Sequence, residues 1–400
     1  MPRVLGKGGP PAPNPFQYGR ELAPDELVDR RDELAVVHRT METNGKLFLI
    51  GRRRFGKTSL LAAAASTANR DGLATVVRED AERHLDAAAL GQALLTEAAR
   101  RLLGPAERAA RKLREVAVHL RPELTIQPDS NTFSVAIGRT APGGALQTLV
   151  EVLDAIDRMG EQATHPVSVI IDEFQHLVVR DGVDGERQLR ATVQRHRHVG
   201  YIFAGSAVRL LADMTGQHGR PFYRLGSTLT LGRLPRGEFA AFLEAGFARQ
   251  GWGVEPGAVE AMLDAGEEVP YSVQRIAHEA WELVRVAQGE VALTREIASM
   301  AQAKVLRQEG PLYAQLWNGL TAQQQRALAA VVREHGMLLY SKQVARHSGL
   351  STATMQRAIA ALAGPSRGLV IEESDPESGS TRHVLEDPMF AAWIAATGRE

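Results

Sequence analysis

The stretch GRRRFGKTSL, residues 51–60, constrains this chain more than any other. It fits the pattern G-x-x-x-x-G-K-[ST], in which successive backbone N–H groups curl around a phosphate. An apolar run at 47–50 precedes it and an alanine-rich helical run at 60–68 follows it, which is the strand–loop–helix context that the pattern requires. The chain is therefore predicted to bind a nucleoside triphosphate.

Each position of this loop has an expected task. Gly51 and Gly56 permit backbone angles and a close approach that a β-carbon would obstruct. Lys57 is expected to place its ammonium against the outer phosphates and Thr58 to offer a hydroxyl to Mg²⁺, so ATP and Mg²⁺ are the predicted cofactors. For Arg52, Arg53 and Arg54 the pattern leaves two interpretations open: contact with the phosphates, or charged side chains exposed to solvent. The remaining predicted nucleotide-binding residues of the loop are Arg52, Arg53, Arg54, Phe55 and Ser59.

A second motif is the apolar, β-branched run 167–171, which ends in Asp172 and Glu173. A run of this kind is buried on both faces and belongs to a parallel sheet covered by helices. We expect Asp172 to bind Mg²⁺ and Glu173 to polarise the attacking water. A further apolar run, 201–204, ends near Ser206, which is either a sensor of the γ-phosphate or a simple helix cap.

The predicted fold class is α/β, a P-loop NTPase with a parallel sheet between helices, followed by a helical lid and a winged helix-turn-helix. The expected segments are a disordered N-terminus at 1–14, the ATPase domain at 15–235, the lid at 236–318 and the winged helix at 319–400. In the winged helix, Met355, Ile359 and Leu362 form the predicted buried stripe of the third helix. Asn14 and Phe16 open the ordered part of the chain and are predicted nucleotide-binding residues, and the helical segment 25–39 is expected near the nucleotide base.

Composition excludes several classes of function. The chain has no cysteine, which removes disulfides and thiol catalysis, and it has 47 basic and 47 acidic residues, so nucleic-acid binding would need a local patch. No apolar run reaches membrane-spanning length and the N-terminus lacks a signal-peptide core, so a cytoplasmic protein without membrane contact is expected. His196 and His198, beside two arginines on a predicted helix 186–198, are interpreted as solvated surface rather than metal ligands.

These motifs resemble the P-loop ATPases at the border of the AAA+ and STAND groups, often labelled archaeal-type ATPases and related to origin-recognition-type ATPases. The resemblance covers nearly the whole chain and rests on N-P-F at 14–16, V-D-R-R-D-E-L at 28–34, the phosphate loop, I-I-D-E-F-Q at 170–175, F-A-G-S at 203–206 and R-P-F-Y-R at 220–224. It implies ATP and Mg²⁺ binding, Glu173 as base and Ser206 as sensor. It also implies Arg224 as an arginine that completes the γ-phosphate site, either of its own chain or of a neighbouring subunit, against the alternative of a structural surface arginine. One departure is Asp29-Arg30, where the family usually has Gly-Arg.

Three functions compete. The first is an ATP-hydrolysing switch in which the nucleotide state is coupled to the lid and winged helix, with a protein partner or self-association through the ATPase domain. The second is a DNA-associated ATPase that binds duplex through the winged helix; the even charge of residues 321–400 makes only weak binding expected. The third, a nucleotide-binding scaffold without turnover, fits poorly because a pure binder has no need of Glu173.

Overall fold

The computed structural model describes residues 13–127, 132–138, 143–287, 292–364, 367–374 and 381–399. The chain forms two compact units, one of residues 21–232 and one that joins the N-terminal segment up to residue 20 with residues 233–400. The chain therefore passes between the units twice, at 20–21 and at 232–233. The predicted disordered segment 1–14 lies largely outside the described residues, and the predicted boundary between a lid and a separate winged helix stays a prediction.

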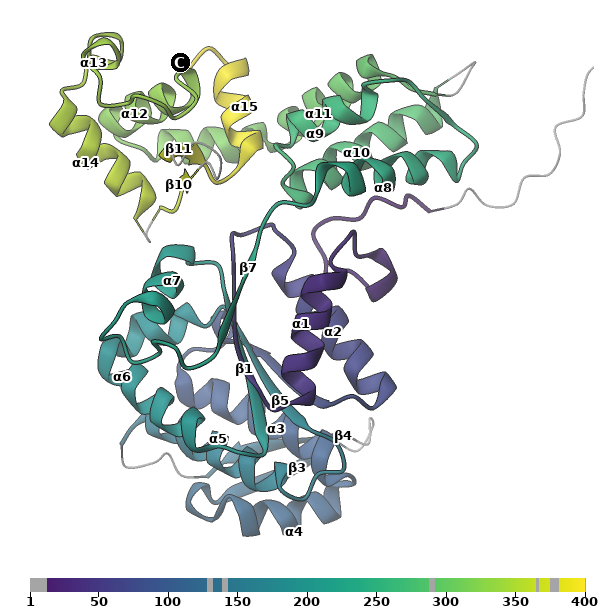
Figure 1. Ribbon diagram of the computed structural model, residues 1–400, viewed down its shortest axis with the longest axis vertical. Helices are drawn as coiled ribbons and strands as arrows, with labels where there is room; N and C mark the ends of the chain where they lie inside the picture. Colours follow the sequence, from purple (N-terminus) through teal and green to yellow (C-terminus); the bar gives the residue numbers. More distant parts are fainter. Residues whose placement is uncertain are drawn as a thin grey trace, which may run out of the picture. The chain divides into compact units, whose positions relative to one another are not determined.

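The unit 21–232 contains a five-stranded sheet in which every neighbouring pair is parallel (Figure 1). The strand order is β2 (Thr75–Asp80), β5 (Val167–Asp172), β6 (Val199–Gly205), β1 (Lys46–Gly51) and β7 (Ser227–Leu231). All residues of β5 and β6 are buried, as their apolar runs predict. Because the strands are parallel, the ends of β1, β5 and β6 meet at one edge of the sheet.

Helices cover both faces of this sheet. Alternate residues of a strand point to opposite faces, so Phe48 and Ile50 join the core beneath α3, α5 and α6, while α1 and α2 cover the other face (Figure 1). The predicted α/β P-loop NTPase fold is confirmed. The helices of this unit are η1 (Pro24–Glu26), α1 (Arg31–Glu42), α2 (Lys57–Asp71), η2 (Ala81–Arg83), α3 (Ala87–Leu103), α4 (Ala106–Val116), η3 (Val118–Leu120), α5 (Ala145–Gly160), α6 (Gln175–Arg195) and α7 (Val208–Gly216). Strands β3 (Pro122–Gln127) and β4 (Thr132–Ile137) form an antiparallel pair.

Helix α6 differs most from its predicted extent of 186–198. It begins at Gln175, directly after the acidic motif, and ends at Arg195. Gly182 interrupts it with a φ of 63°, in the left-handed region that glycine adopts without strain. The sequence around this glycine favours a break, which is why the first half of the helix escaped prediction.

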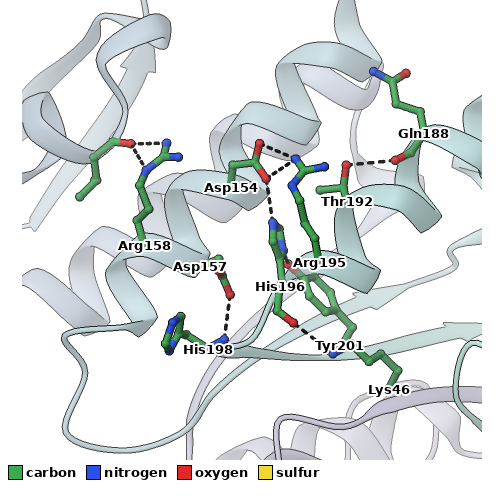
Figure 2. A network of polar contacts seen from close by, with 11 residues as sticks. Lys46, Asp154, Asp157, Arg158, Gln188, Thr192, Arg195, His196, His198 and Tyr201 are labelled. Carbon is green, nitrogen blue, oxygen red and sulfur yellow. Dashed lines mark hydrogen bonds and ion pairs between the residues drawn. The ribbon is translucent and has the colours of Figure 1, made fainter.

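The prediction that His196 is solvated surface is wrong. His196 is 5% exposed and connects two parts of the core (Figure 2). Its Nε2 lies 2.7 Å from Asp154 Oδ1 and its Nδ1 lies 2.7 Å from the Tyr201 hydroxyl. Burial by itself raises the pKa of Asp154, but hydrogen bonds from His196 and Arg195 outweigh it and lower that pKa below its ordinary value. An ionised carboxylate can only accept, so His196 Nε2 donates to Asp154. In the neutral imidazole, Nδ1 is then the nitrogen that accepts from the Tyr201 hydroxyl.

The second unit is mainly helical, and it also contains a parallel pair of two-residue strands that the sequence did not predict. Residues 322–385 form three helices followed by an antiparallel strand pair, the order predicted for the winged helix-turn-helix, and Met355, Ile359 and Leu362 are buried as expected. A last helix packs on α11 through Tyr313 and Phe390. The elements are α8 (Arg236–Ala248), β8 (Gly253–Val254), α9 (Ala258–Ala265), α10 (Pro270–Val286), β9 (Ala292–Leu293), α11 (Arg295–Asn318), α12 (Ala322–Arg333), α13 (Lys342–Ser348), α14 (Thr352–Ala363), β10 (Val370–Ser374), β11 (Thr381–Leu385) and α15 (Pro388–Ala396). Within the described ranges, no helix combines the length and apolar character needed to cross a membrane.

We predict that Tyr201→Phe lowers the free energy of unfolding of the unit 21–232 by about 1–3 kcal/mol, because His196 Nδ1 loses its donor in a buried place. Tyr340→Phe is the matched control, since that exposed hydroxyl also contacts a histidine, His383, at 3.2 Å, and its loss should cost less than about 0.5 kcal/mol. Urea unfolding followed by circular dichroism measures both. Equal effects of the two substitutions would contradict the assigned network.

Candidate functional site

The phosphate-binding pattern lies between β1 and α2, in the predicted strand–loop–helix order. Gly56 precedes the first helical residue with a φ of 86°. At Gly51, a β-carbon would lie 2.9 Å from Leu231 Cβ, so the approach of β7 requires glycine there. No side chain caps the first turn of α2, so its N–H groups and the positive end of the helix dipole are directed at the loop.

Lys57 and the arginines of the loop have different environments. Lys57 is 4% exposed, and its Nζ donates to the carbonyl oxygen of Arg52 at 3.1 Å, which places the ammonium inside the curl of the loop. The Arg52 guanidinium lies over the ring of the buried Phe55, 5.8 Å from its centroid. Arg53 and Arg54 are exposed. The loop thus combines one enclosed cation, Lys57, with a half-buried arginine over Phe55 and two arginines at its outer surface.

The two predicted magnesium ligands lie together. Thr58 Oγ1 donates to Asp172 Oδ2 at 2.9 Å, across the end of β6. Asp172 is 2% exposed. Burial raises the pKa of Asp172 above its ordinary value and the charge of Glu173 adds to this, whereas the hydrogen bond from Thr58 opposes it. A hydroxyl and a carboxylate are oxygen ligands of the kind that Mg²⁺ prefers, so these residues fit that ion.

Glu173 and Ser206, predicted separately as base and sensor, are in direct contact. Ser206 Oγ donates to Glu173 Oε2 at 2.8 Å, and Gln175 Nε2 donates to the same oxygen. Burial by itself raises the pKa of Glu173, but these hydrogen bonds and the charge of Lys57 outweigh it and lower that pKa below its ordinary value. Glu173 is therefore ionised at neutral pH. Gln175 was not predicted as a site residue, and its only signal in the sequence is its place two residues after Glu173.

Arg30 is a second residue of this region that was not predicted from the sequence. It is 6% exposed, and its Nη2 donates to the carbonyl oxygen of Gly232 at 2.7 Å and to that of Phe55, in the phosphate loop, at 3.5 Å. Its Nη1 pairs with Glu33 at 2.7 Å. The preceding Asp29 has a φ of 28°, at the position where the resembling family usually has glycine. Arg30 therefore joins the phosphate loop to the last residue of the unit.

The remaining nucleotide-binding predictions concern residues whose polar groups already have partners. Ser59 Oγ accepts from the backbone N–H of Leu22 at 3.2 Å. The Asn14 side chain donates to the carbonyl oxygen of His278 at 3.1 Å. Phe16 is fully buried against Phe247, within the helical unit. The contacts of Asn14 and Phe16 attach the N-terminal segment to α10 and α8, and a role for these two residues in nucleotide binding stays a prediction.

Arg224 is exposed and lies on a firmly held segment between α7 and β7. Its guanidinium lies 5.2 Å from the centroid of the Tyr223 ring, and its φ is 54°. Arg190 donates to the carbonyl oxygen of Tyr223 at 3.1 Å, and Arg220 pairs with the buried Glu186. The side chain is thus presented to solvent from a rigid base, and its predicted role at a γ-phosphate stays a prediction.

No profile of a known protein family and no curated protein matches this sequence. The fold is similar to that of the Walker-type ATPase PABY2304 of Pyrococcus abyssi, with a TM-score of 0.60 and 17% identity over 95% of this chain and 99% of that one. It is also similar to the ORC2 protein of Aeropyrum pernix in its ADPNP–ADP complexes, with a TM-score of 0.55 and 17% identity over 97% of this chain and 98% of that one. The predicted resemblance in fold is therefore confirmed along nearly the whole chain.

We predict that Arg30→Lys weakens ATP binding, because a single ammonium cannot contact both carbonyl groups and the phosphate loop loses one restraint. The dissociation constant for ATP should rise by about 10- to 100-fold, which is the contribution of one hydrogen bond from a charged donor. Isothermal titration calorimetry measures it. Arg31→Lys, at the exposed neighbouring position, is the control. An affinity of the Arg30→Lys protein equal to that of the control would show that this contact does not shape the loop.

Proposed function

We propose that this chain binds ATP with Mg²⁺ and hydrolyses it, and that the nucleotide state controls the helical and C-terminal segments. The observation that carries the proposal is the 2.9 Å hydrogen bond between Thr58 and Asp172, because it joins the phosphate loop to the carboxylate edge of the sheet. Neither motif alone would make a site for a metal-bound triphosphate. The similar folds of a Walker-type ATPase and of a protein in ADPNP–ADP complexes support the choice of an adenine nucleotide.

Binding would use the loop and the start of α2. The backbone N–H groups of residues 51–57 and the Lys57 ammonium neutralise the phosphates, and the helix dipole adds to this. Thr58 and Asp172 would hold Mg²⁺, which supplies charge neutralisation at the phosphate oxygens when it is bound. The raised pKa of the buried Asp172 would fall beside a divalent cation, because the ionised form then gains an opposite charge.

Hydrolysis would use Glu173. Its carboxylate is ionised at neutral pH and lies one residue beyond the metal-binding Asp172, so the two acids can serve different tasks. Glu173 would accept a proton from the attacking water, and Ser206 would contact the γ-phosphate. Arg224, exposed on its rigid segment, would complete the site from a neighbouring copy of the chain.

Coupling to the rest of the chain would run through Arg30. Its contacts with Phe55 and Gly232 tie the phosphate loop to the point where the chain leaves this unit. The next residue, Arg233, belongs to the second unit and pairs there with Glu373 of β10 at 3.1 Å. Any change in the loop on nucleotide binding therefore acts on the connection to the helical and C-terminal segments.

Two substitutions should separate binding from hydrolysis. Lys57→Ala should reduce ATP affinity to the point where hydrolysis is lost, because the ammonium contacts phosphate in the ground state. Glu173→Gln should keep ATP affinity within about twofold and lower turnover by about 100-fold or more, because the base acts only on water. Calorimetry and phosphate release measure the two effects. Hydrolysis by the Glu173→Gln protein at the original rate would refute the assignment of the base.

DNA binding through residues 319–400 is the second candidate function. Residues 341–371 contain Lys342, Arg346, Arg357 and Arg367 and no acid, which favours a local contact with phosphates. Against it, Arg367 donates to the carbonyl oxygen of Gly319, and the segment 321–400 has eight basic and eight acidic residues. We place a protein-docking role slightly ahead of DNA recognition.

We predict that the full chain binds duplex DNA weakly near physiological salt, with an affinity that falls steeply as salt rises. Fluorescence anisotropy with random and selected duplexes at two salt concentrations measures it. The triple variant Lys342→Ala/Arg346→Ala/Arg357→Ala should no longer bind the duplex measurably, because it lacks these three basic side chains. Nanomolar, sequence-selective binding would contradict the prediction and make the DNA-associated ATPase the first candidate.

A further inference from the structure

The turn between α12 and α13 exposes two apolar side chains that are neighbours in the sequence. Met337 is 41% exposed and Leu338 is 78% exposed. The following residue, Leu339, is only 3% exposed and belongs to the core, so the turn is attached to the fold from within. Met337 and Leu338 therefore form a small apolar surface on a turn whose position is fixed.

This turn is held in an uncommon backbone conformation. Leu338 has a φ of 50°, in the left-handed region that bulky residues seldom adopt. A β-carbon at Gly336 would overlap the carbonyl oxygen of His383, so β11 approaches the turn closely. Two backbone bonds fix its ends, because the N–H of His383 donates to the carbonyl oxygen of Gly336 at 3.1 Å and that of Ser341 to Leu338 at 2.9 Å. The fold thus keeps Leu338 in solvent despite the strain, and strain of this kind points to a function.

Two exposed cations follow the turn along α13. Ser341 caps this helix, and Lys342 and Arg346 come directly after it, four residues apart. Residues at this spacing lie on the same face of a helix, about 6 Å apart along its axis. Among the described residues, no carboxylate forms an ion pair with either of them. The apolar pair is therefore continued by two cations that lack a partner of opposite charge.

Acids are absent from this stretch of the chain. Residues 335–371 contain none. Of the two acids that flank the stretch, Glu334 already pairs with Arg333 at 2.9 Å, and Glu372 lies on β10. Burial and the charge of Glu372 raise the pKa of the Tyr340 hydroxyl, so this carboxylate lies beside Tyr340 and bounds the apolar surface there. The charge along α13 itself is positive only.

The combination of apolar and cationic groups favours a protein partner over nucleic acid. Lys342 and Arg346 could contact phosphates, but Met337 and Leu338 gain little against a charged backbone. A protein segment that carries apolar residues beside carboxylates complements both features. The apolar pair then leaves water, and the two cations meet opposite charges.

We propose that Met337, Leu338, Lys342 and Arg346 form a docking surface for an acidic segment of a partner protein that carries apolar anchor residues. This docking surface rests on the protein-docking role placed ahead of DNA recognition above, and it identifies the residues and the partner chemistry of that role. Leu338 is the main anchor because it is the more exposed of the apolar pair. Lys342 and Arg346 select carboxylates and make the affinity depend on salt.

The docking surface can be tested with the full chain free of nucleotide and a synthetic peptide as the probe. The probe is a fluorescent amphipathic helix of about five turns, with leucines on one face and glutamates on the other. Fluorescence anisotropy should show that it binds at least about tenfold more tightly than a peptide with the same residues in shuffled order. A peptide with lysine in place of every glutamate should bind no better than the shuffled one.

Two variants separate the apolar and the charged contributions. Leu338→Asn removes the anchor but keeps a residue that tolerates the left-handed conformation, and it should weaken binding by about tenfold. Lys342→Ala/Arg346→Ala should weaken binding by a similar factor and remove most of its salt dependence. Leu85→Asn is the matched control, a leucine of the other unit that is 87% exposed, and it should change the affinity by less than about twofold.

Three results would overturn the docking surface. The first is equal binding of the acidic and the shuffled peptide to the wild-type chain, and the second is unchanged peptide binding by the Leu338→Asn protein. The third is duplex DNA binding that falls in the Leu338→Asn protein while the acidic peptide does not compete, which would assign the surface to DNA. A chain that binds the acidic peptide through Leu338 but does not hydrolyse ATP would refute the proposed ATPase and leave the docking surface supported.

Discussion

The hydrogen bond from Thr58 to Asp172 is the contact on which the candidate site depends. It spans the end of β6 and brings together a residue of the phosphate loop and a residue 114 positions later in the chain. The parallel sheet makes this possible, because β1, β5 and β6 all present their carboxyl ends at the same edge. Lys57, Glu173, Gln175 and Ser206 then lie around this contact. Lys57 is the first residue of α2, and the other three follow the end of β5 or β6 by one to three residues.

The site is also tied to the two places where the chain changes unit. The backbone of Leu22, just after the first crossing, donates to Ser59 in α2, and Gly232, just before the second, accepts from Arg30. Ser59 lies in the first turn of α2, directly after the phosphate loop, and Arg30 donates to the carbonyl oxygen of Phe55 in that loop. The phosphate loop region is thus hydrogen-bonded close to both ends of the unit 21–232.

Local patterns predicted much of this site. The glycine and lysine spacing of residues 51–58 predicted the loop, and an apolar run ending in two acids predicted β5 and its carboxylates, because both signals lie within one element and its neighbours. The errors concern residues whose environment is set by distant segments. His196 carried a surface-like neighbourhood but is buried by Asp154 and Tyr201, and nothing local distinguished buried Arg30 from exposed Arg31. Gln175 was missed for the same reason, since its partner Ser206 follows another strand.

The most direct test of the account is the electron paramagnetic resonance spectrum of Mn²⁺ used in place of Mg²⁺, with ATP and the full chain. The account predicts one tightly bound Mn²⁺ per chain that appears only with ATP, and its loss in both the Thr58→Ala and the Asp172→Ala proteins. A spectrum of Mn²⁺–ATP that the wild-type chain leaves unchanged would contradict the claim that the phosphate loop and the end of β5 form one nucleotide site.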